Sequence, residues 1–290
     1  MSTQRLRLGV EFAIITKHIY GYHGEGAKNG LPWNGGITGM EAYANAARAT
    51  QRLREMIEAS GRIAFLGGAG VSTESGIPDF RSENGHFEAI RKYGQPPEVL
   101  LSHSFFLRFP ERFYEYYRAA LLVTDIRPNS AHKALAKLER EGKLTAVITQ
   151  NIDGLHQAAG SKSVFELHGS IYRNRCMDCH KFFTAEELKA MPCVPRCACG
   201  GLIKPEVVLY EEGLDQDVLR GAIAHIMRAD MLIVGGTSLA VYPAAGLIDY
   251  YRGNRLVLIN KSETPYDGRA DLVIHDSIGA VLAGICQMEE

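Results

Sequence analysis

Apolar and polar positions follow two different periods along this chain of 290 residues. From residue 60 onward, short continuous runs of Val, Ile, Leu and Ala are separated by stretches with helical spacing. Continuous apolar runs are typical of parallel strands that are buried on both faces, whereas half-exposed strands alternate. We therefore predict six strands, at Arg62–Gly68, Ala146–Asn151, Val164–His168, Met231–Gly235, Leu256–Asn260 and Leu272–His275.

Helices are predicted between these strands. Ser130–Glu141 has helical spacing and is stopped by Gly142, and Leu214–Arg228 reads as a second helix. Strands that alternate with helices imply right-handed crossovers and a parallel sheet. The predicted fold class is therefore α/β, with a doubly wound, Rossmann-like parallel sheet whose strand ends face a ligand crevice.

Two segments interrupt this alternation. Ser82–Val123 looks helical and rich in aromatic residues, with Pro110 at a plausible helix start, and Ile171–Val208 contains most of the cysteines. Because both segments lie between sheet strands, we predict that they form one small inserted domain. The predicted division is a large domain at 40–82, 124–170 and 209–290, and a small helical and zinc-binding domain at 83–123 and 171–208.

The first 39 residues differ from the rest, since they hold 8 of the 30 glycines and show no sustained periodicity. Thr38 and Glu41 then form a capping-box pair at the start of an amphipathic helix. We expect residues 1–39 to be a poorly ordered N-terminal extension. The alternative is that Met40 is the natural start of the protein.

Composition excludes several classes of protein. Lys and Arg total 32 against 33 Asp and Glu, a formal charge of -1, which gives no global attraction to nucleic acid or anionic membranes. The 46% hydrophobic content is typical of a globular chain. No apolar run approaches the roughly 20 residues of a spanning helix, and Glu11 and Lys17 interrupt the early apolar stretch. We expect a cytoplasmic protein without membrane or specific nucleic-acid partners.

The cysteines indicate a metal site, because five of the six fall within 24 residues. Cys176 and Cys179 are followed, after a gap of 17 residues, by Cys197 and Cys199, which resembles a zinc ribbon with four thiolate ligands. Cys193 is an alternative partner for Cys197. The paired glycines after Cys199 favour Cys197 and Cys199 as ligands. Four thiolates leave no open position for water, so the zinc is expected to be structural.

Polar residues follow several predicted strands at the ligand edge of the sheet. A glycine-rich loop at 68–76 follows the first strand, where a backbone could approach a pyrophosphate, although a simple tight turn gives the same pattern. Gln150, Asn151 and Asp153 follow the second strand and suit either a site or a turn. His168 ends the third and is a candidate general base or a structural histidine. Thr237 with Ser238, and Asn260 with Lys261, could hold a ribose or adenine.

These segments together resemble the sirtuin family of NAD-dependent protein deacylases over roughly residues 42–285. The resemblance depends on motifs that occur in the family's order along the chain. They are GAGVSTESGIPDFRS at 68–82, TQNIDGLH at 149–156, LHGS at 167–170, the cysteine pairs, KPEVVLYEE at 204–212, GGTSLAVYPAA at 235–245 and LIN at 258–260.

The resemblance implies roles for individual positions. His168 matches the general base, and Asn151 matches a catalytic residue that positions the nicotinamide ribose. Val207, Val208 and Leu209 match the strand beside the acyl-lysine tunnel. The other positions match residues that bind NAD: Ala69, Thr73, Phe80, Arg81, Gln150, Ile152, Asp153, Thr237, Ser238, Asn260, Lys261 and Ser277.

The resemblance also implies a reaction. NAD is a co-substrate that is consumed: the acyl oxygen of an acetylated lysine displaces nicotinamide, His168 deprotonates a ribose hydroxyl, and O-acetyl-ADP-ribose leaves. The region 85–91 lacks the Tyr-x-x-Arg pair of family members that prefer acidic acyl groups, so we expect a neutral, acetyl-like group. Glu211 replaces a usual glycine, which affects the expected peptide contacts. Dehydrogenase, nucleic-acid-binding zinc ribbon and ADP-ribosyltransferase are the competing classes.

Overall fold

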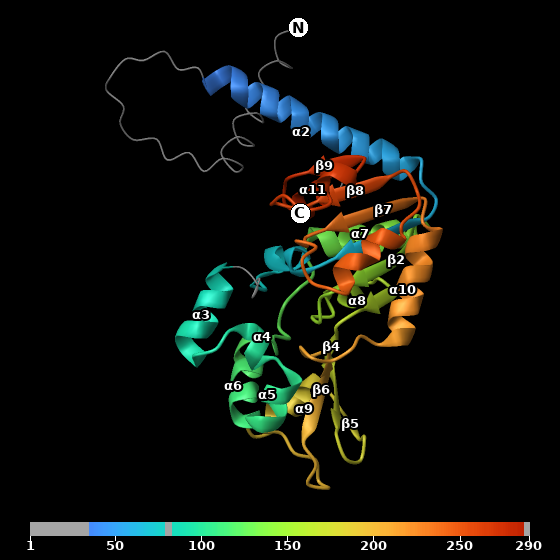
Figure 1. The fold of residues 1–290 in the computed structure, drawn as a ribbon. Coiled ribbons are helices and arrows are strands. Elements are labelled where there is room, and N and C mark those ends of the chain that lie inside the picture. The colour runs from blue at the N-terminus through green and yellow to red at the C-terminus, as the bar shows by residue number, and fades with distance from the viewer. Residues whose placement is uncertain (1–34, 79–82, 287–290) are drawn as a thin grey trace, which may run out of the picture. The chain divides into compact units, whose positions relative to one another are not determined.

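The computed structural model describes residues 35–78 and 83–286 (Figure 1). Residues 1–43 and 44–290 form two compact units, which are described separately. In the first, helix α2 (Gly35–Glu58, which continues into the second unit) begins three residues before Thr38, so the predicted helix start is wrong. The helix continues through the predicted cap and includes Gly35 and Gly36. The predictions for residues 1–34, Phe80 and Arg81 lie outside the described residues.

The large sheet has six parallel strands in the order β3-β2-β1-β7-β8-β9. All six predicted strands are confirmed, with ends that differ by at most two residues. The chain builds outward from β1 in one direction and then from β1 in the other, so the order reverses between β1 and β7, the switch point of a doubly wound sheet. The strands are β1 (Ile63–Gly67), β2 (Leu144–Thr149), β3 (Val164–Glu166), β7 (Met231–Gly235), β8 (Leu256–Ile259) and β9 (Leu272–Ile274).

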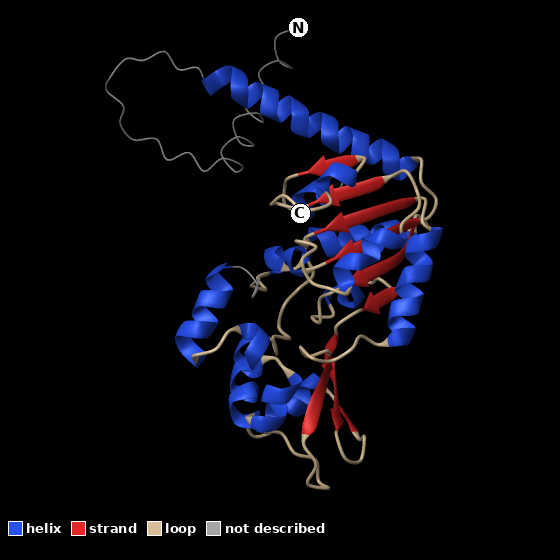
Figure 2. Cartoon of the chain, viewed as in Figure 1, coloured by secondary structure: helices blue, strands red, loops and turns tan. Residues whose placement is uncertain are grey.

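Helices cover both faces of this sheet, as Figure 2 shows. Leu53 and Ile57 of α2 pack on one face with α7 (Ser130–Arg140) and α11 (Ile278–Cys286). On the other face lie α10 (Gln216–Arg228) and the 3-10 helix η3 (Ala244–Tyr250). Burial on both sides explains why the strands read as unbroken apolar runs. No helix in the described residues combines the length and apolar character needed to cross a membrane.

A smaller lobe contains the two interrupting segments. Its antiparallel sheet, in the order β5-β4-β6, packs with helices α3 to α6 and α9 around one core. Pro110 begins α6, as predicted. The elements are α3 (Glu83–Tyr93), α4 (Pro97–Leu100), α5 (His103–Arg108), α6 (Pro110–Ala120), β4 (Gly169–Cys176), β5 (Phe182–Phe183), α9 (Ala185–Ala190) and β6 (Ile203–Val207).

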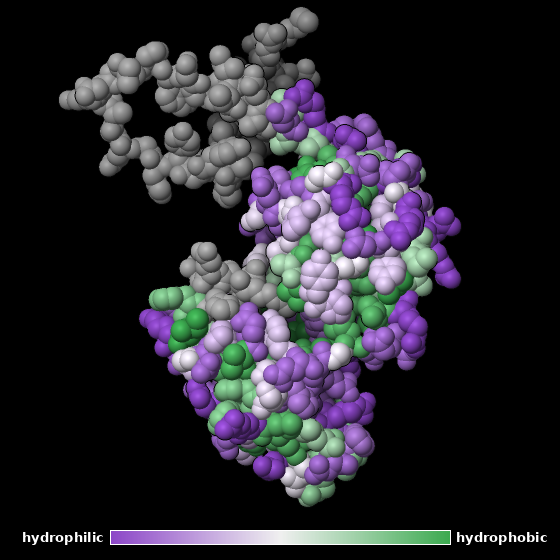
Figure 3. All heavy atoms as spheres, in the orientation of Figure 1, coloured by the Kyte–Doolittle hydropathy of each residue, from purple (hydrophilic) through white to green (hydrophobic). Residues whose placement is uncertain are grey.

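Aromatic side chains fill the core of this lobe. Phe113 packs edge-on against Phe106 and Tyr114, with ring centroids 4.9 and 5.1 Å apart. The Tyr114 hydroxyl donates to the Ile203 carbonyl and so joins α6 to β6. Other apolar side chains of the lobe stay exposed, among them Phe87 on α3 and Leu107 on α5; apolar surface is visible in the lower half of Figure 3.

Gly169 connects the two sheets, because it begins β4 immediately after His168. Its φ is +77°. A Cβ atom at this position would lie 1.8 Å from the carbonyl oxygen of Glu206 on β6. Glycine is therefore required here both for the backbone conformation and for the close approach of β4 and β6.

We predict that Gly169→Ala lowers the free energy of unfolding by about 3 kcal/mol or more, because the methyl group forces β4 away from β6. Gly160→Ala is the matched control, since Gly160 has φ +105° but no atom within 4 Å of the added Cβ. The control measures only the cost of placing alanine at a positive φ, which we expect to be about 1 kcal/mol. Urea unfolding of both variants measures the difference. Equal destabilisation would contradict the packing explanation.

Candidate active site and metal centre

The ends of β1, β2 and β7 converge because these strands pair in parallel, with Gly67 opposite both Thr149 and Gly235. The Gly70 amide donates to the Gly236 carbonyl at 2.8 Å. A Cβ at Gly70 would lie 2.7 Å from the Gly236 Cα atom. In the described structure, this loop glycine thus allows two loops to touch; its predicted role of admitting a pyrophosphate stays a prediction.

Side chains from three loops form a hydrogen-bonded network at this edge. Gln150 Nε2 donates to Thr237 Oγ1 at 3.1 Å and links the loops after β2 and β7. Ser72 Oγ donates to Asp153 Oδ2 at 2.7 Å and accepts from Asn151 Nδ2 at 3.0 Å. Ser72 was not singled out from the sequence, although its place inside the glycine-rich loop was a usable signal. The network fixes Asn151 and Asp153 relative to the loop.

Asp153 is buried, with 9% of its surface exposed. Burial raises the pKa of its carboxyl group, while the Ser72 hydroxyl and the Leu155 amide, which donates to Oδ1 at 2.9 Å, lower it. Burial is the larger effect, so the pKa of Asp153 is raised overall. A carboxyl group that folding desolvates at a sheet edge is typical of functional sites.

Two histidines lie buried beneath this network. His132, on α7, places Nε2 3.5 Å from Ser72 Oγ, and its ring centroid lies 4.7 Å from that of His156, on α8 (Leu155–Ala158). Burial lowers the pKa of His132 to about 4 and that of His156 well below its usual range. Both rings are therefore neutral near pH 7. From the sequence, His132 falls among the histidines that lack a place at a strand end, and the role of His156 stays open.

The position of the protons on the His168 ring follows from one contact. Nδ1 lies 2.9 Å from the carbonyl oxygen of Gln150. A carbonyl only accepts, so Nδ1 carries the proton and Nε2 is the basic nitrogen of the neutral ring. The carbonyl oxygen of His168 accepts from the Val208 amide at 2.9 Å, which ties this residue to the segment after β6.

A cavity of about 300 Å³ opens beside these groups. Ala69, Gln150, Asn151, Ile152, Asp153 and His168 line it, and so do Val207, Val208 and Leu209. Its only charged lining residues, among those that the structure describes, are the acidic Asp153, Glu211 and Glu212. The structure thus brings nine of the predicted site residues around one cavity.

The remaining predicted positions in the described residues do not line the cavity, although they lie at the same sheet edge. Thr73 Oγ1 donates to the Gly70 carbonyl at 3.0 Å, and Asn260 Nδ2 donates to the Ser262 carbonyl at 2.8 Å. Ser277 Oγ donates to Glu74, which sequence reasoning missed. Ser238 and Lys261 are exposed, and Thr237 bonds Gln150 as described.

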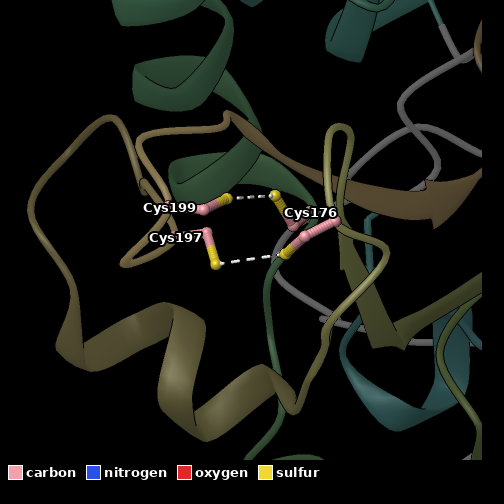
Figure 4. A group of neighbouring side chains, drawn as sticks. Cys176, Cys197 and Cys199 are labelled. Atoms are coloured by element: carbon pink, nitrogen blue, oxygen red, sulfur yellow. Dashed lines mark hydrogen bonds between the residues drawn. The ribbon is translucent and has the colours of Figure 1, made fainter.

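Four sulfur atoms meet in the small lobe (Figure 4). The sulfurs of Cys176, Cys179, Cys197 and Cys199 all lie within 4.8 Å of one another, with Cys176 to Cys199 at 3.5 Å and Cys179 to Cys197 at 3.6 Å. A tetrahedral zinc site with Zn–S bonds of about 2.3 Å places sulfurs about 3.8 Å apart. Cys193 instead contacts the Glu111 carbonyl at 3.8 Å.

The acid–base chemistry of these thiols also fits a cation. The Cys179 amide and other backbone donors lower the pKa of Cys176 to about 7. The Gly201 amide lowers the pKa of Cys199, but the three neighbouring cysteines outweigh it and raise the value to about 12. Crowded thiolates repel one another, and a divalent ion removes that repulsion. The four residues fit structural zinc.

The molecule is a doubly wound α/β protein with a buried polar network at its switch point, a basic histidine nitrogen and a four-cysteine cluster that fits a metal ion. Residues 68–243 match the model of the Sir2 family. The chain belongs to this family.

Individual relatives agree with that assignment. The chain is 61% identical over 236 residues to an NAD-dependent protein deacetylase of Clostridium perfringens, a match that covers 81% of this chain and 97% of the relative. A solved structure of Sir2 with p53 peptide and NAD+ is 39% identical, with a TM-score of 0.73, over 82% of this chain and 97% of that chain. A complex of Sir2 with an inhibitor, 2′-O-acetyl-ADP-ribose and deacetylated p53 peptide has the same identity and coverage and a TM-score of 0.72.

Cys199→Ala tests the metal centre against Cys193→Ala, its matched control. We expect the wild type and Cys193→Ala to bind about one zinc ion per chain. Cys199→Ala should lose the metal and several kcal/mol of stability, because structural zinc contributes directly to folding. Metal analysis and thermal unfolding give the two readouts. Loss of zinc in Cys193→Ala would overturn the ligand set.

His132 should make stability depend on pH. Its pKa is about 4 in the folded protein and about 6.5 when unfolded, so between these values the unfolded chain binds more protons and stability falls on acidification. From about pH 7.5 to about pH 5 this histidine should cost about 2 kcal/mol. Urea unfolding measures the free energy of unfolding at both pH values. The loss between them should be about 2 kcal/mol smaller in His132→Gln than in the wild type. Equal losses in both proteins would contradict a neutral buried His132.

Proposed function

We propose that this protein is an NAD-dependent protein lysine deacetylase, which transfers the acetyl group of an acetylated lysine to ADP-ribose and releases nicotinamide and O-acetyl-ADP-ribose. The observation that carries the proposal is the orientation of His168, whose protonated Nδ1 faces the Gln150 carbonyl beside the cavity. The names of the relatives, and the NAD+, peptide and acetyl-ADP-ribose in the titles of their complexes, support the same activity.

His168 is the proposed general base. Because Nδ1 is fixed as a donor, Nε2 accepts a proton from a ribose hydroxyl, which then bonds to the acetyl carbon. The bond between that carbon and the lysine nitrogen breaks, and lysine leaves as a free amine. NAD would supply the ribose and the departing nicotinamide, whose place on the ribose carbon the acyl oxygen takes. One water would supply the new carbonyl oxygen of the acetyl ester, and no hydride moves.

Asn151 is the second proposed catalytic residue. Its amide is held by Ser72, and Asp153 accepts from the same hydroxyl, so the amide and carboxyl groups are preorganised. Gln150, held by Thr237, would position the nicotinamide ribose with Asn151. The other proposed NAD contacts are Ala69, Thr73, Phe80, Arg81, Ile152, Asp153, Thr237, Ser238, Asn260, Lys261 and Ser277.

The proposed acyl-lysine contacts are Val207, Val208 and Leu209, which form an apolar side of the cavity. The charged side chains among the described residues that line the cavity are all acidic, which disfavours a negatively charged acyl group. This supports a neutral acyl group such as acetyl.

Zinc held by the four cysteines would stabilise the small lobe and take no part in the chemistry. We also propose the domain division expected from the sequence, with the six-stranded sheet as the NAD-binding domain. A cytoplasmic location and the lack of a nucleic-acid partner stay predictions.

We predict that His168→Ala lowers kcat for deacetylation of an acetyl-lysine peptide by about a hundredfold or more, the usual contribution of a general base. Exchange of labelled nicotinamide should fall less, because nicotinamide leaves before the base acts. His225→Ala, on α10, is the control. Peptide mass spectrometry and scintillation counting measure the two reactions. Unchanged deacetylation in His168→Ala would contradict the proposed mechanism.

A further inference from the structure

The loop that follows β6 forms one wall of the cavity mouth and carries two acidic residues with different surroundings. Glu212 lies 3.0 Å from Lys204 Nζ and 2.7 Å from His103 Nδ1. Burial raises the pKa of Glu212, but the Leu209 amide and these partners outweigh it, so the net shift is downward. Its charge is therefore balanced within the protein.

Glu211 contacts no cation in the described residues. Its two carboxylate oxygens accept from the amide and the hydroxyl of Ser104, each at 2.9 Å. Both donors are neutral and the side chain is exposed, so Glu211 contributes a negative charge at the cavity that no cation of the described residues balances.

The backbone around Glu211 is fixed before any substrate arrives. Tyr210 donates to the Leu101 carbonyl and accepts from the His103 amide, both at 3.0 Å. Glu211 itself has φ +77°, a conformation that side chains rarely adopt. Within the described part of the chain, its own amide and carbonyl have no hydrogen-bond partner. An extended peptide could therefore pair with the backbone beside this carboxylate.

Residues 241–243 also line the cavity and carry no charge, and Tyr242 is 68% exposed there. An aromatic face attracts a cation, as a carboxylate does. Glu211 and Tyr242 thus favour the same type of side chain.

We propose that Glu211 selects acetylated substrates with an Arg or Lys close to the acetyl-lysine. This inference rests on the proposed function and refines it, since main-chain pairing alone gives little sequence preference.

The test compares peptides that differ only in the residues that flank the acetyl-lysine, which are Arg, Ala or Glu. The wild type should show a higher kcat/KM for the Arg peptide than for the Glu peptide, and added salt should reduce the ratio. Glu211→Gln keeps the side-chain size and should lower this ratio about two- to fivefold, the range of an exposed ion pair. The Ala peptide should be little affected.

Two further variants make the result decisive. Glu211→Gly removes the charge at a position whose φ suits glycine, so it should lose the same preference even if Glu211→Gln folds poorly. Glu115→Gln, an exposed residue of α6 that does not line the cavity, is the control and should keep the wild-type ratio.

The outcomes separate this inference from the proposed function. Deacetylation with the same Arg-to-Glu ratio in the wild type and both Glu211 variants would overturn the role of Glu211 alone. If the wild type deacetylates none of the peptides in the presence of NAD, the proposed function fails, and the role of Glu211 fails with it.

Discussion

The parallel pairing of β1 with β2 and β7 is the constraint on which the site depends. It sets the ends of three strands level, with Gly67 opposite Thr149 and Gly235. The first residues of the three loops can then meet: the Gly70 amide reaches Gly236, and Gln150 reaches Thr237. A side chain at Gly70 would push the two loops apart. Close packing of the loop backbones therefore fixes the site before any ligand binds.

Burial then sets the charge of the groups that lie at this edge. Asp153 is desolvated but accepts hydrogen bonds from Ser72 and the Leu155 amide, which limit the cost of its charge. His132 and His156 lie deeper and are held neutral. Because these two rings are neutral, they add no positive charge beneath Ser72. The negative charge at its mouth comes from the loop that carries Glu211.

The sequence predicts the large sheet well because buried parallel strands have a strong local signal. It predicts the four-cysteine cluster for a similar reason, since metal ligands occur at characteristic spacings. The helix start at Thr38 was wrong because a capping box permits a helix end without requiring one. Ser72, His132 and Glu74 were missed because their partners lie far away in sequence, and only the folded sheet edge brings them together. The conformation of Glu211 likewise depends on α5, which no local pattern at 209–212 reveals.

The stoichiometry of products from the wild-type enzyme tests the central claim most directly. With NAD and an acetyl-lysine peptide, mass spectrometry should find equal amounts of free-lysine peptide, nicotinamide and O-acetyl-ADP-ribose. That result follows if the acetyl group moves to the ribose under base catalysis by His168. Free acetate as the primary product, reduced NAD, or ADP-ribose attached to the peptide would contradict the account.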